Sequence, residues 1–285
     1  MDRSQGNIFY RPGSKRSNVT HSTHLNKAII GYEPGESSAE GCVIVEIHMP
    51  SIPLQSFIDV QYLDSKTMSQ RPGMILKYLP VLYDELNGRL LSGGAYLFET
   101  YDDARGYVQW AGEDFEVGEP KVNFTKQPAF ELFEGKAWEV LGAHSFLPID
   151  EHVVTRLMKW HVGEDAGLTT KLRDVYHLLL ATAEGERNVA SVWLLHDPDT
   201  GSVGLQTGFK KVGGTDEAGA RRTLQTARAF NVLETMLSSA LSLEPSFDRT
   251  SLLLTLWLPK SRAAGGAELT IPYYPLVPDI SHEHT

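Results

Sequence analysis

Short runs of alternating or β-branched hydrophobic residues recur along this chain, and stretches with helical spacing separate them. The first run, Cys42–Met49, is typical of a strand that ends at Pro50. The stretch Leu54–Tyr62 repeats hydrophobic residues at i, i+3, i+4 and i+8, which predicts an amphipathic helix. Two further strands, Met74–Tyr83 and Arg89–Phe98, follow as a hairpin, because the Asn-Gly pair between them is a strong turn signal.

A helix and a fourth strand complete this first series. Thr100 and Asp103 resemble a capping box with Asp in the place of Glu, and helical spacing continues to Ala111. A strand near Ala137–Phe146 comes next. The resulting order, β-α-β-β-α-β, is that of a ferredoxin-like unit.

The second half repeats the order of elements with little identity of residues. It predicts a strand at Val154–Val162, followed by a helix with a hydrophobic stripe from Leu168 to Leu179. A hairpin of Val189–Leu195 and Val203–Lys210 comes next. One long helix, capped by Thr215 and with inner residues from Leu224 to Ala240, then leads to a closing strand at Leu252–Leu258. The sequence therefore predicts an α+β protein built from two ferredoxin-like units in tandem.

A ferredoxin-like unit covers one face of its sheet with helices and leaves the other face bare, so that face must be buried elsewhere. We expect the two sheets to close face to face as an intramolecular dimeric α+β barrel, with a ligand between them. The predicted organisation is an N-terminal arm (1–40), a first unit (41–148), a second unit (149–260) and a C-terminal tail (261–285) that lies extended over a surface.

Two segments of the first unit resemble a known family. Arg71–Tyr78 and Gly93–Glu99, followed by Ala104 and Tyr107, are similar to the strands and helix of short bacterial dimeric α+β-barrel proteins classed as candidate monooxygenases. The resemblance covers about residues 41–115 and is absent from the second half. It implies a ferredoxin-like barrel and cofactor-independent monooxygenase activity, although the same fold also hosts lyases, isomerases, cyclases and haem enzymes.

Composition narrows the class of partner. The 285 residues carry a net charge of -10, from 36 acidic and 26 basic side chains, which argues against nucleic acid as a partner. No run reaches the roughly 18 apolar residues of a membrane helix, and the N-terminus shows no secretory signal. The one cysteine, Cys42, fits a reducing compartment. We expect a cytoplasmic protein, with a homo-oligomer left open because the arm could pack on a second subunit.

Glu46 and His48 form the best candidate for chemistry. They are two residues apart on one strand, so both side chains project from the face opposite Val43, Val45 and Ile47, which is the face that a barrel encloses. A carboxylate there can orient and charge an imidazole that acts as a base. The alternative is a structural polar pair, buried or at the barrel rim.

Further residues are candidates for substrate binding. His161 shares a face with Lys159 on the counterpart strand, and the other candidates are Lys77, Tyr78, Tyr96 and His144. Three histidines and a carboxylate would suit a metal, but their spacing matches no strong ligand motif. A Gly-rich phosphate loop is absent from the sequence. We therefore expect no metal, flavin or other cofactor; haem remains an alternative, since chlorite dismutases also carry two ferredoxin-like repeats.

The leading functional hypothesis is a small-molecule enzyme with an apolar or aromatic substrate inside the barrel. The resemblance favours a cofactor-independent monooxygenase in which His48, helped by Glu46, generates a carbanion that reacts with oxygen. The same pocket and base would also serve a lyase, an isomerase or a cyclase. A non-catalytic ligand-binding or assembly protein is the alternative of another class.

Overall fold

The structure is a computed structural model that describes residues 34–49, 71–84, 89–128, 130–148, 151–163, 167–214, 217–258 and 269–272. The helix predicted at Leu54–Tyr62 and the cap predicted at Thr215 lie outside these ranges. None of the described helices is long and apolar enough to cross a membrane.

The first unit has the strand order of a ferredoxin-like sheet. Its elements are β2 (Gly41–Met49), β3 (Met74–Asp84), β4 (Arg89–Phe98), α2 (Tyr101–Glu113) and β7 (Leu132–Ser145). The strands lie in the order β7-β2-β4-β3 and all neighbours are antiparallel. Helix α2 begins where the sequence predicts, because the Thr100 hydroxyl oxygen accepts a hydrogen bond of 3.0 Å from the Asp103 backbone N–H.

The second unit has the same arrangement. Its elements are β8 (His152–His161), α3 (Leu168–Glu184), β9 (Val189–Asp197), β10 (Ser202–Lys210), α4 (Glu217–Ala229), α5 (Val232–Leu241) and β11 (Phe247–Leu258). The strand order β11-β8-β10-β9 matches that of the first unit when each strand is replaced by its counterpart.

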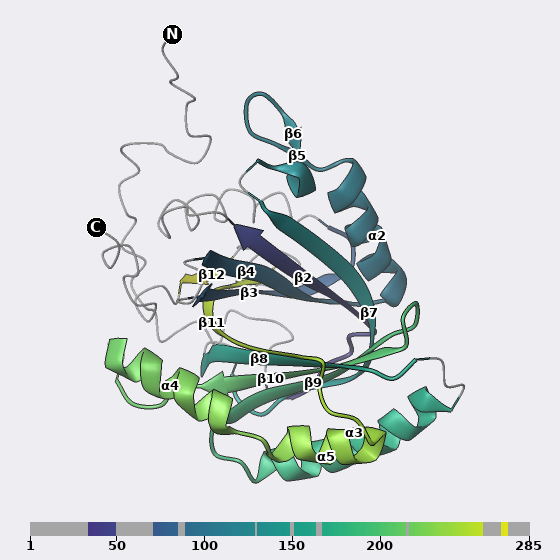
Figure 1. Cartoon of the computed structure of the whole chain (residues 1–285), viewed down its shortest axis with the longest axis vertical. Helices are drawn as coiled ribbons and strands as arrows, with labels where there is room; N and C mark the ends of the chain where they lie inside the picture. Colours follow the sequence, from purple (N-terminus) through teal and green to yellow (C-terminus); the bar gives the residue numbers. More distant parts are fainter. Residues whose placement is uncertain are drawn as a thin grey trace.

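The two sheets close into a barrel through two further antiparallel pairings. Strand β3 pairs with β11, and β7 pairs with β9, so that β7, β2, β4, β3, β11, β8, β10 and β9 form a continuous ring. Figure 1 shows the two sheets facing each other, with α2 outside one and α3, α4 and α5 outside the other. The prediction of two tandem ferredoxin-like units that form an intramolecular barrel is confirmed.

Shorter elements extend this frame. Strand β1 (Gly35–Glu36) pairs with the end of β7, and β12 (Leu269–Pro272) pairs with the end of β11. A small hairpin of β5 (Glu116–Val117) and β6 (Val122–Asn123) and the short helix η2 (Phe124–Lys126) follow α2. The described part of the C-terminal tail is thus an added strand, which satisfies backbone groups of β11.

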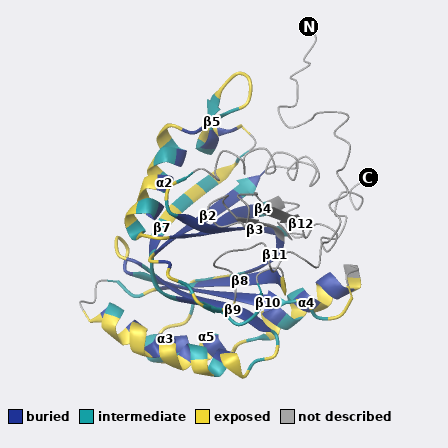
Figure 2. Cartoon of the chain, turned by 180° about the vertical axis from the view of Figure 1, so that it is seen from behind, coloured by how far each residue is buried: buried dark blue, intermediate teal, exposed yellow. Residues whose placement is uncertain are grey.

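Alternation along β2 divides its side chains between two cores. Val43, Val45 and Ile47 pack in the cluster under α2 that includes Tyr107, whereas Cys42 and Ile44 belong to the cluster that lies between the sheets and under the helices of the second unit. Figure 2 shows both sheets buried between outward-facing, exposed helix surfaces. The inner face of β2 is therefore the one that carries Glu46 and His48.

The prediction of one long helix in the second unit is wrong. Two helices, α4 and α5, replace it, with a break at Phe230 and Asn231. The Phe230 carbonyl oxygen accepts a hydrogen bond of 2.5 Å from the Arg156 guanidinium, and the Phe230 ring packs edge-on against Phe209. These contacts hold the chain against β8 and β10 at the break, and they outweigh the continuity of the helical pattern.

Strands β7 and β11 begin well before their predicted first residues. Strand β7 starts at Leu132 rather than near Ala137, and β11 starts at Phe247 rather than at Leu252. The added residues of β7 alternate between exposed and half-buried positions, and those of β11 are mostly polar. Pairing with β2 and with β8 forms these strands, so a hydrophobic pattern alone does not reveal them.

Candidate functional site

A charged cluster crosses the inside of the barrel at the end of β2. The Lys159 ammonium of β8 donates a hydrogen bond to Glu46 Oε1, and Arg249 Nη1 of β11 lies 3.9 Å from Glu46 Oε2. The side chains of Glu46 and Arg249 are only 11% and 9% exposed. We call Glu46, Lys159 and Arg249 the Glu46 cluster; it joins the first unit to the second.

The Glu46 cluster carries two cations for one carboxylate. Burial lowers the pKa of Arg249 from its ordinary value, and the charge of Glu46 opposes this shift. Because a guanidinium keeps its proton under all ordinary conditions, Arg249 remains a cation inside the barrel. The cluster therefore has an excess of positive charge in a region largely removed from water.

Aromatic rings and a glycine shape the surroundings of the cluster. The Lys159 ammonium lies 4.6 Å from the centre of the Phe247 ring and 5.8 Å from that of Trp138, and the Arg249 guanidinium lies 5.5 Å from Phe247. Gly93 faces Glu46 across the β2–β4 pair, and a Cβ atom at Gly93 would clash with the Val45 carbonyl oxygen, whereas its 3.4 Å distance from an Arg249 nitrogen would be an ordinary contact. The close approach of the β2 backbone therefore requires glycine at this position.

His48 lies two residues after Glu46 on the same inner face of β2, and it is half-buried. Among the described residues, no hydrogen bond of its imidazole is seen, and Glu46 binds Lys159 and Arg249 instead of His48. The expected neighbours Glu46 and His48 thus share the face, while the partners of Glu46 come from the other unit. A base role for His48 stays a prediction.

A second polar group inside the barrel is neutral. The Tyr78 hydroxyl lies 2.6 Å from His152 Nδ1, and His152 Nε2 lies 3.3 Å from the Leu147 carbonyl oxygen. Since a carbonyl only accepts, Nε2 carries the proton and Nδ1 accepts from Tyr78. The Tyr78 ring also stacks on Trp193 with centroids 5.2 Å apart. We call Tyr78, His152 and Trp193 the Tyr78 cluster.

Burial keeps both titratable members of the Tyr78 cluster uncharged. Desolvation lowers the pKa of His152 to about 4, and the hydrogen bond to Leu147 opposes it only partly. Desolvation also raises the pKa of Tyr78 far above its usual value. Sequence reasoning found Tyr78 but missed His152, because the strand was expected to begin at Val154, and a register shift between β8 and β10 at this end takes His152 out of the alternation of the strand.

Two residues predicted to bind substrate lie outside the barrel interior. Tyr96 packs against Tyr107 under α2, with ring centroids 5.1 Å apart. Lys77 is buried on the same outer side, with its ammonium 5.5 Å from the centre of the Tyr96 ring. Both side chains face the helix layer because they alternate with Tyr78 and Ala95, which face inward.

The two remaining histidines lie at strand ends. His161 is exposed at the end of β8, with Nδ1 3.5 Å from the Ser202 hydroxyl. His144, near the end of β7, lies 3.7 Å from a Glu36 carboxylate oxygen and contacts the Phe146 ring. The structure therefore does not bring His48, His144 and His161 together with one carboxylate. Among the described residues, no group of three or more His, Cys, Asp or Glu side chains is placed to hold a metal.

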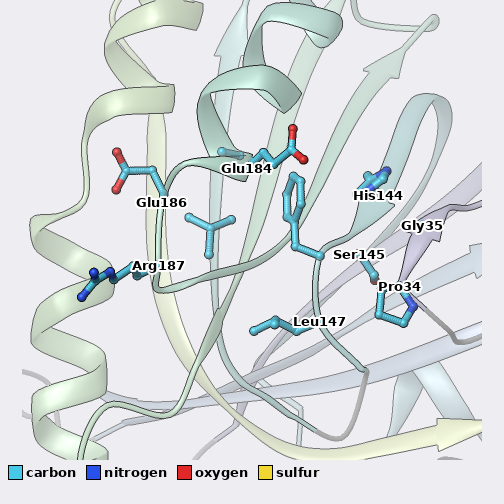
Figure 3. A pocket seen from close by; sticks show the side chains of 11 residues that line it. Pro34, Gly35, His144, Ser145, Leu147, Glu184, Glu186 and Arg187 are labelled. Carbon is cyan, nitrogen blue, oxygen red and sulfur yellow. The ribbon is translucent and has the colours of Figure 1, made fainter.

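A surface pocket of about 440 Å³ lies where β7 ends beside the end of α3, and His144, Phe146, Leu147, Glu184 and Arg187 are among its lining residues. Figure 3 shows His144 and Arg187 on opposite sides of it. A second pocket, of about 310 Å³, lies beside α5. Neither contains a member of the Glu46 cluster.

No family model and no curated protein matches this sequence. Solved structures do. An anthrone oxidase-like protein superposes with a TM-score of 0.50 at 11% identity, over 83% of this chain and 96% of its own. A candidate monooxygenase from Fusobacterium nucleatum gives 0.49 at 11% identity, over 81% and 97%. One from Lactobacillus acidophilus gives 0.45 at 9% identity, over 81% and 99%.

These similarities concern the fold. The superposition on the anthrone oxidase-like protein covers more of the chain than either unit contains, so it includes both units. The resemblance in fold that was expected from residues 41–115 is confirmed, and it extends to the half of the chain whose sequence lacks the motifs.

Proposed function

We propose that this chain is a small-molecule enzyme that binds an apolar or aromatic substrate at the Glu46 cluster and oxygenates it without a cofactor. The observation that carries the proposal is the excess of buried positive charge between the sheets, beside aromatic rings and one step from His48. A barrel needs no ions to close, because apolar side chains of similar volume stabilise an interior at least as well.

The proposed reaction begins with proton removal. His48 takes a proton from a carbon next to a carbonyl group or from a phenol, and the negative charge spreads to the carbonyl oxygen. Lys159 and Arg249 stabilise that oxyanion. The carbanion transfers electrons to O₂; for a methylene such as that of anthrone, both C–H bonds are replaced by a new C=O bond. One oxygen atom enters the product and the other leaves as water.

Glu46 has a different role in this proposal from the one expected from sequence. Its carboxylate holds the Lys159 ammonium in place across the barrel, at a position of β2 two residues from His48. It therefore acts as a positioning residue rather than as the direct partner of the imidazole.

A non-catalytic binding protein is the second candidate, because one observation favours it. Trp138, Trp193 and Tyr78 are fully buried and fill much of the inner face. Such packing restricts a ligand to the neighbourhood of the Glu46 cluster. A lyase, isomerase or cyclase would use the same base without consuming oxygen.

Oxygen uptake with anthrone as the probe tests the proposal. We expect the wild type to consume oxygen, and His48→Ala to reduce the rate by about a hundred- to ten-thousand-fold with an unchanged melting temperature. His177→Ala, an exposed histidine on α3, is the matched control and should keep full activity. If the wild type binds the probe without consuming oxygen, the proposal fails; equal turnover by His48→Ala would remove His48 from the mechanism.

A further inference from the structure

We infer that the ligand of the Glu46 cluster is an aromatic carboxylate, and that Arg249 binds its carboxylate group inside the barrel. The inference rests on the proposed function for the location of the ligand and adds the chemical class of the ligand. It follows from the unmet hydrogen-bonding capacity of the inner face.

Arg249 is buried with few hydrogen-bond acceptors near its guanidinium. Its guanidinium has five N–H donors in a planar fork, and the side chain is 9% exposed. Its contacts among the described residues are the Glu46 carboxylate at 3.9 Å, which is beyond hydrogen-bond distance, and the face of Phe247. In contrast, Arg156 on the outer face of β8 donates to Asp248, Glu234 and the Phe230 carbonyl. A buried guanidinium without such acceptors indicates a missing anionic partner.

Two neutral donors point to the same conclusion. Trp138 Nε1 and Gln206 Nε2 are buried, and neither has a hydrogen-bond partner in the part of the chain that the structure describes. In the sheet register, Arg249 pairs with Leu157 and Leu157 pairs with Gln206, so Arg249 and Gln206 share one row of the inner face. Trp138 belongs to the same interior, since its ring lies 5.8 Å from the Lys159 ammonium. Both groups are hydrogen-bond donors, and a ligand rich in acceptor oxygens would satisfy them.

A carboxylate fits this surface better than a neutral carbonyl compound. It brings one negative charge to a cluster with one surplus cation, and its two oxygens match the fork of a guanidinium as a bidentate pair. The Phe247 and Trp138 rings beside the cations offer apolar contacts for an aromatic body. Lys159 can share the carboxylate while it keeps its bond to Glu46.

The surface pocket beside α3 is a poorer site for the same ligand. Its lining includes Glu184 and Glu186 for the single arginine, Arg187, and His144 already faces Glu36. Two carboxylates beside one arginine would repel an anion. This difference in charge separates the two locations in an experiment.

An anaerobic titration tests the inference. The probes are 1-hydroxy-2-naphthoate and its methyl ester, and tryptophan fluorescence quenching gives the two dissociation constants. We expect the wild type to bind the acid at least about tenfold more tightly than the ester, because one charged hydrogen-bonded pair is worth about that factor. Arg249→Met should abolish the preference, and Arg228→Met, at an exposed position on α4, should retain it.

The variant Arg249→Lys provides a second test, because it keeps the positive charge and removes the planar fork of N–H donors. Its affinity for the acid should fall severalfold while its melting temperature stays near that of the wild type. Equal binding of acid and ester by the wild type, or an unchanged preference in both Arg249 variants, would overturn the inference. Because oxygen is excluded, these results do not depend on turnover: oxygen uptake with anthrone but no preference for the acid would leave the proposed function intact and remove the carboxylate.

Discussion

The barrel holds two polar groups that differ in charge and in contact with solvent. The Tyr78 cluster is fully buried, and its two titratable members are neutral and bonded to each other. The Glu46 cluster keeps three charges, with the Lys159 side chain still 20% exposed. A buried group that satisfies itself in neutral form contributes to the core, whereas a buried surplus charge requires a partner. We therefore expect a structural role for the first cluster and propose a binding role for the second.

Removal of His152 should have the largest effect on stability. His152→Ala leaves a cavity at a fully buried position and removes the acceptor of the Tyr78 hydroxyl hydrogen bond. We expect the free energy of unfolding to fall by about 4 kcal/mol. Urea denaturation measures this, with the exposed His177→Ala as control. A loss below about 1 kcal/mol would show that the neutral pair is not part of the core.

Lys159→Met should destabilise the chain somewhat less than His152→Ala, by about 3 kcal/mol. The buried Glu46 carboxylate then loses its hydrogen-bonded cation and keeps only Arg249, at 3.9 Å. The triple variant Glu46→Gln, Lys159→Met, Arg249→Met leaves no unpaired ion inside the barrel, so it should recover most of the loss. Thermal or urea unfolding of the single and triple variants provides the comparison. A triple variant less stable than Lys159→Met would contradict a paired charge cluster.

Acid should weaken the fold through His152. Its pKa is about 4 in the folded chain and 6.5 when unfolded, so the unfolded state binds more protons between these values. Stability from the neutral imidazole is complete above pH 6.5 and is lost as the pH falls toward 4. At pH 5 the loss should be about 2 kcal/mol. Urea midpoints at pH 8 and pH 5 measure it, and His152→Gln should flatten this part of the pH dependence.

A surface ion pair on the same strand as Trp138 should show the smallest effect. Lys136 and Glu134 of β7 lie 3.3 Å apart, and both side chains are about half exposed. Lys136→Met should change the free energy of unfolding by less than about 0.5 kcal/mol. A loss as large as that of Lys159→Met would mean that burial does not distinguish the two pairs.

Local patterns predicted the elements of the fold and the direction of single side chains. Alternation along β2 placed Val43 and Val45 toward α2, and Thr100 capped the helix as expected. Such signals are local, because they depend on period and on neighbouring residues. The break between α4 and α5 was not predictable in this way, since contacts of Phe230 with β8 and β10 decide it.

The site was predicted less completely for the same reason. Glu46 was expected to face inward and Lys159 to share a face with His161, yet Glu46 and Lys159 are 113 residues apart in the chain, and only closure of the barrel brings them together. Arg249 was missed because it lies in the polar part of β11, which pairing rather than hydrophobicity makes a strand. His152 was missed because the predicted strand began two residues too late.

A crystal structure of the chain with bound 1-hydroxy-2-naphthoate most directly tests whether the Glu46 cluster binds the ligand. We expect ligand density between the sheets, with the carboxylate on Arg249 and an oxygen within hydrogen-bond distance of Gln206 or Trp138. Density in the pocket of His144 and Arg187 with the barrel interior unchanged would contradict it.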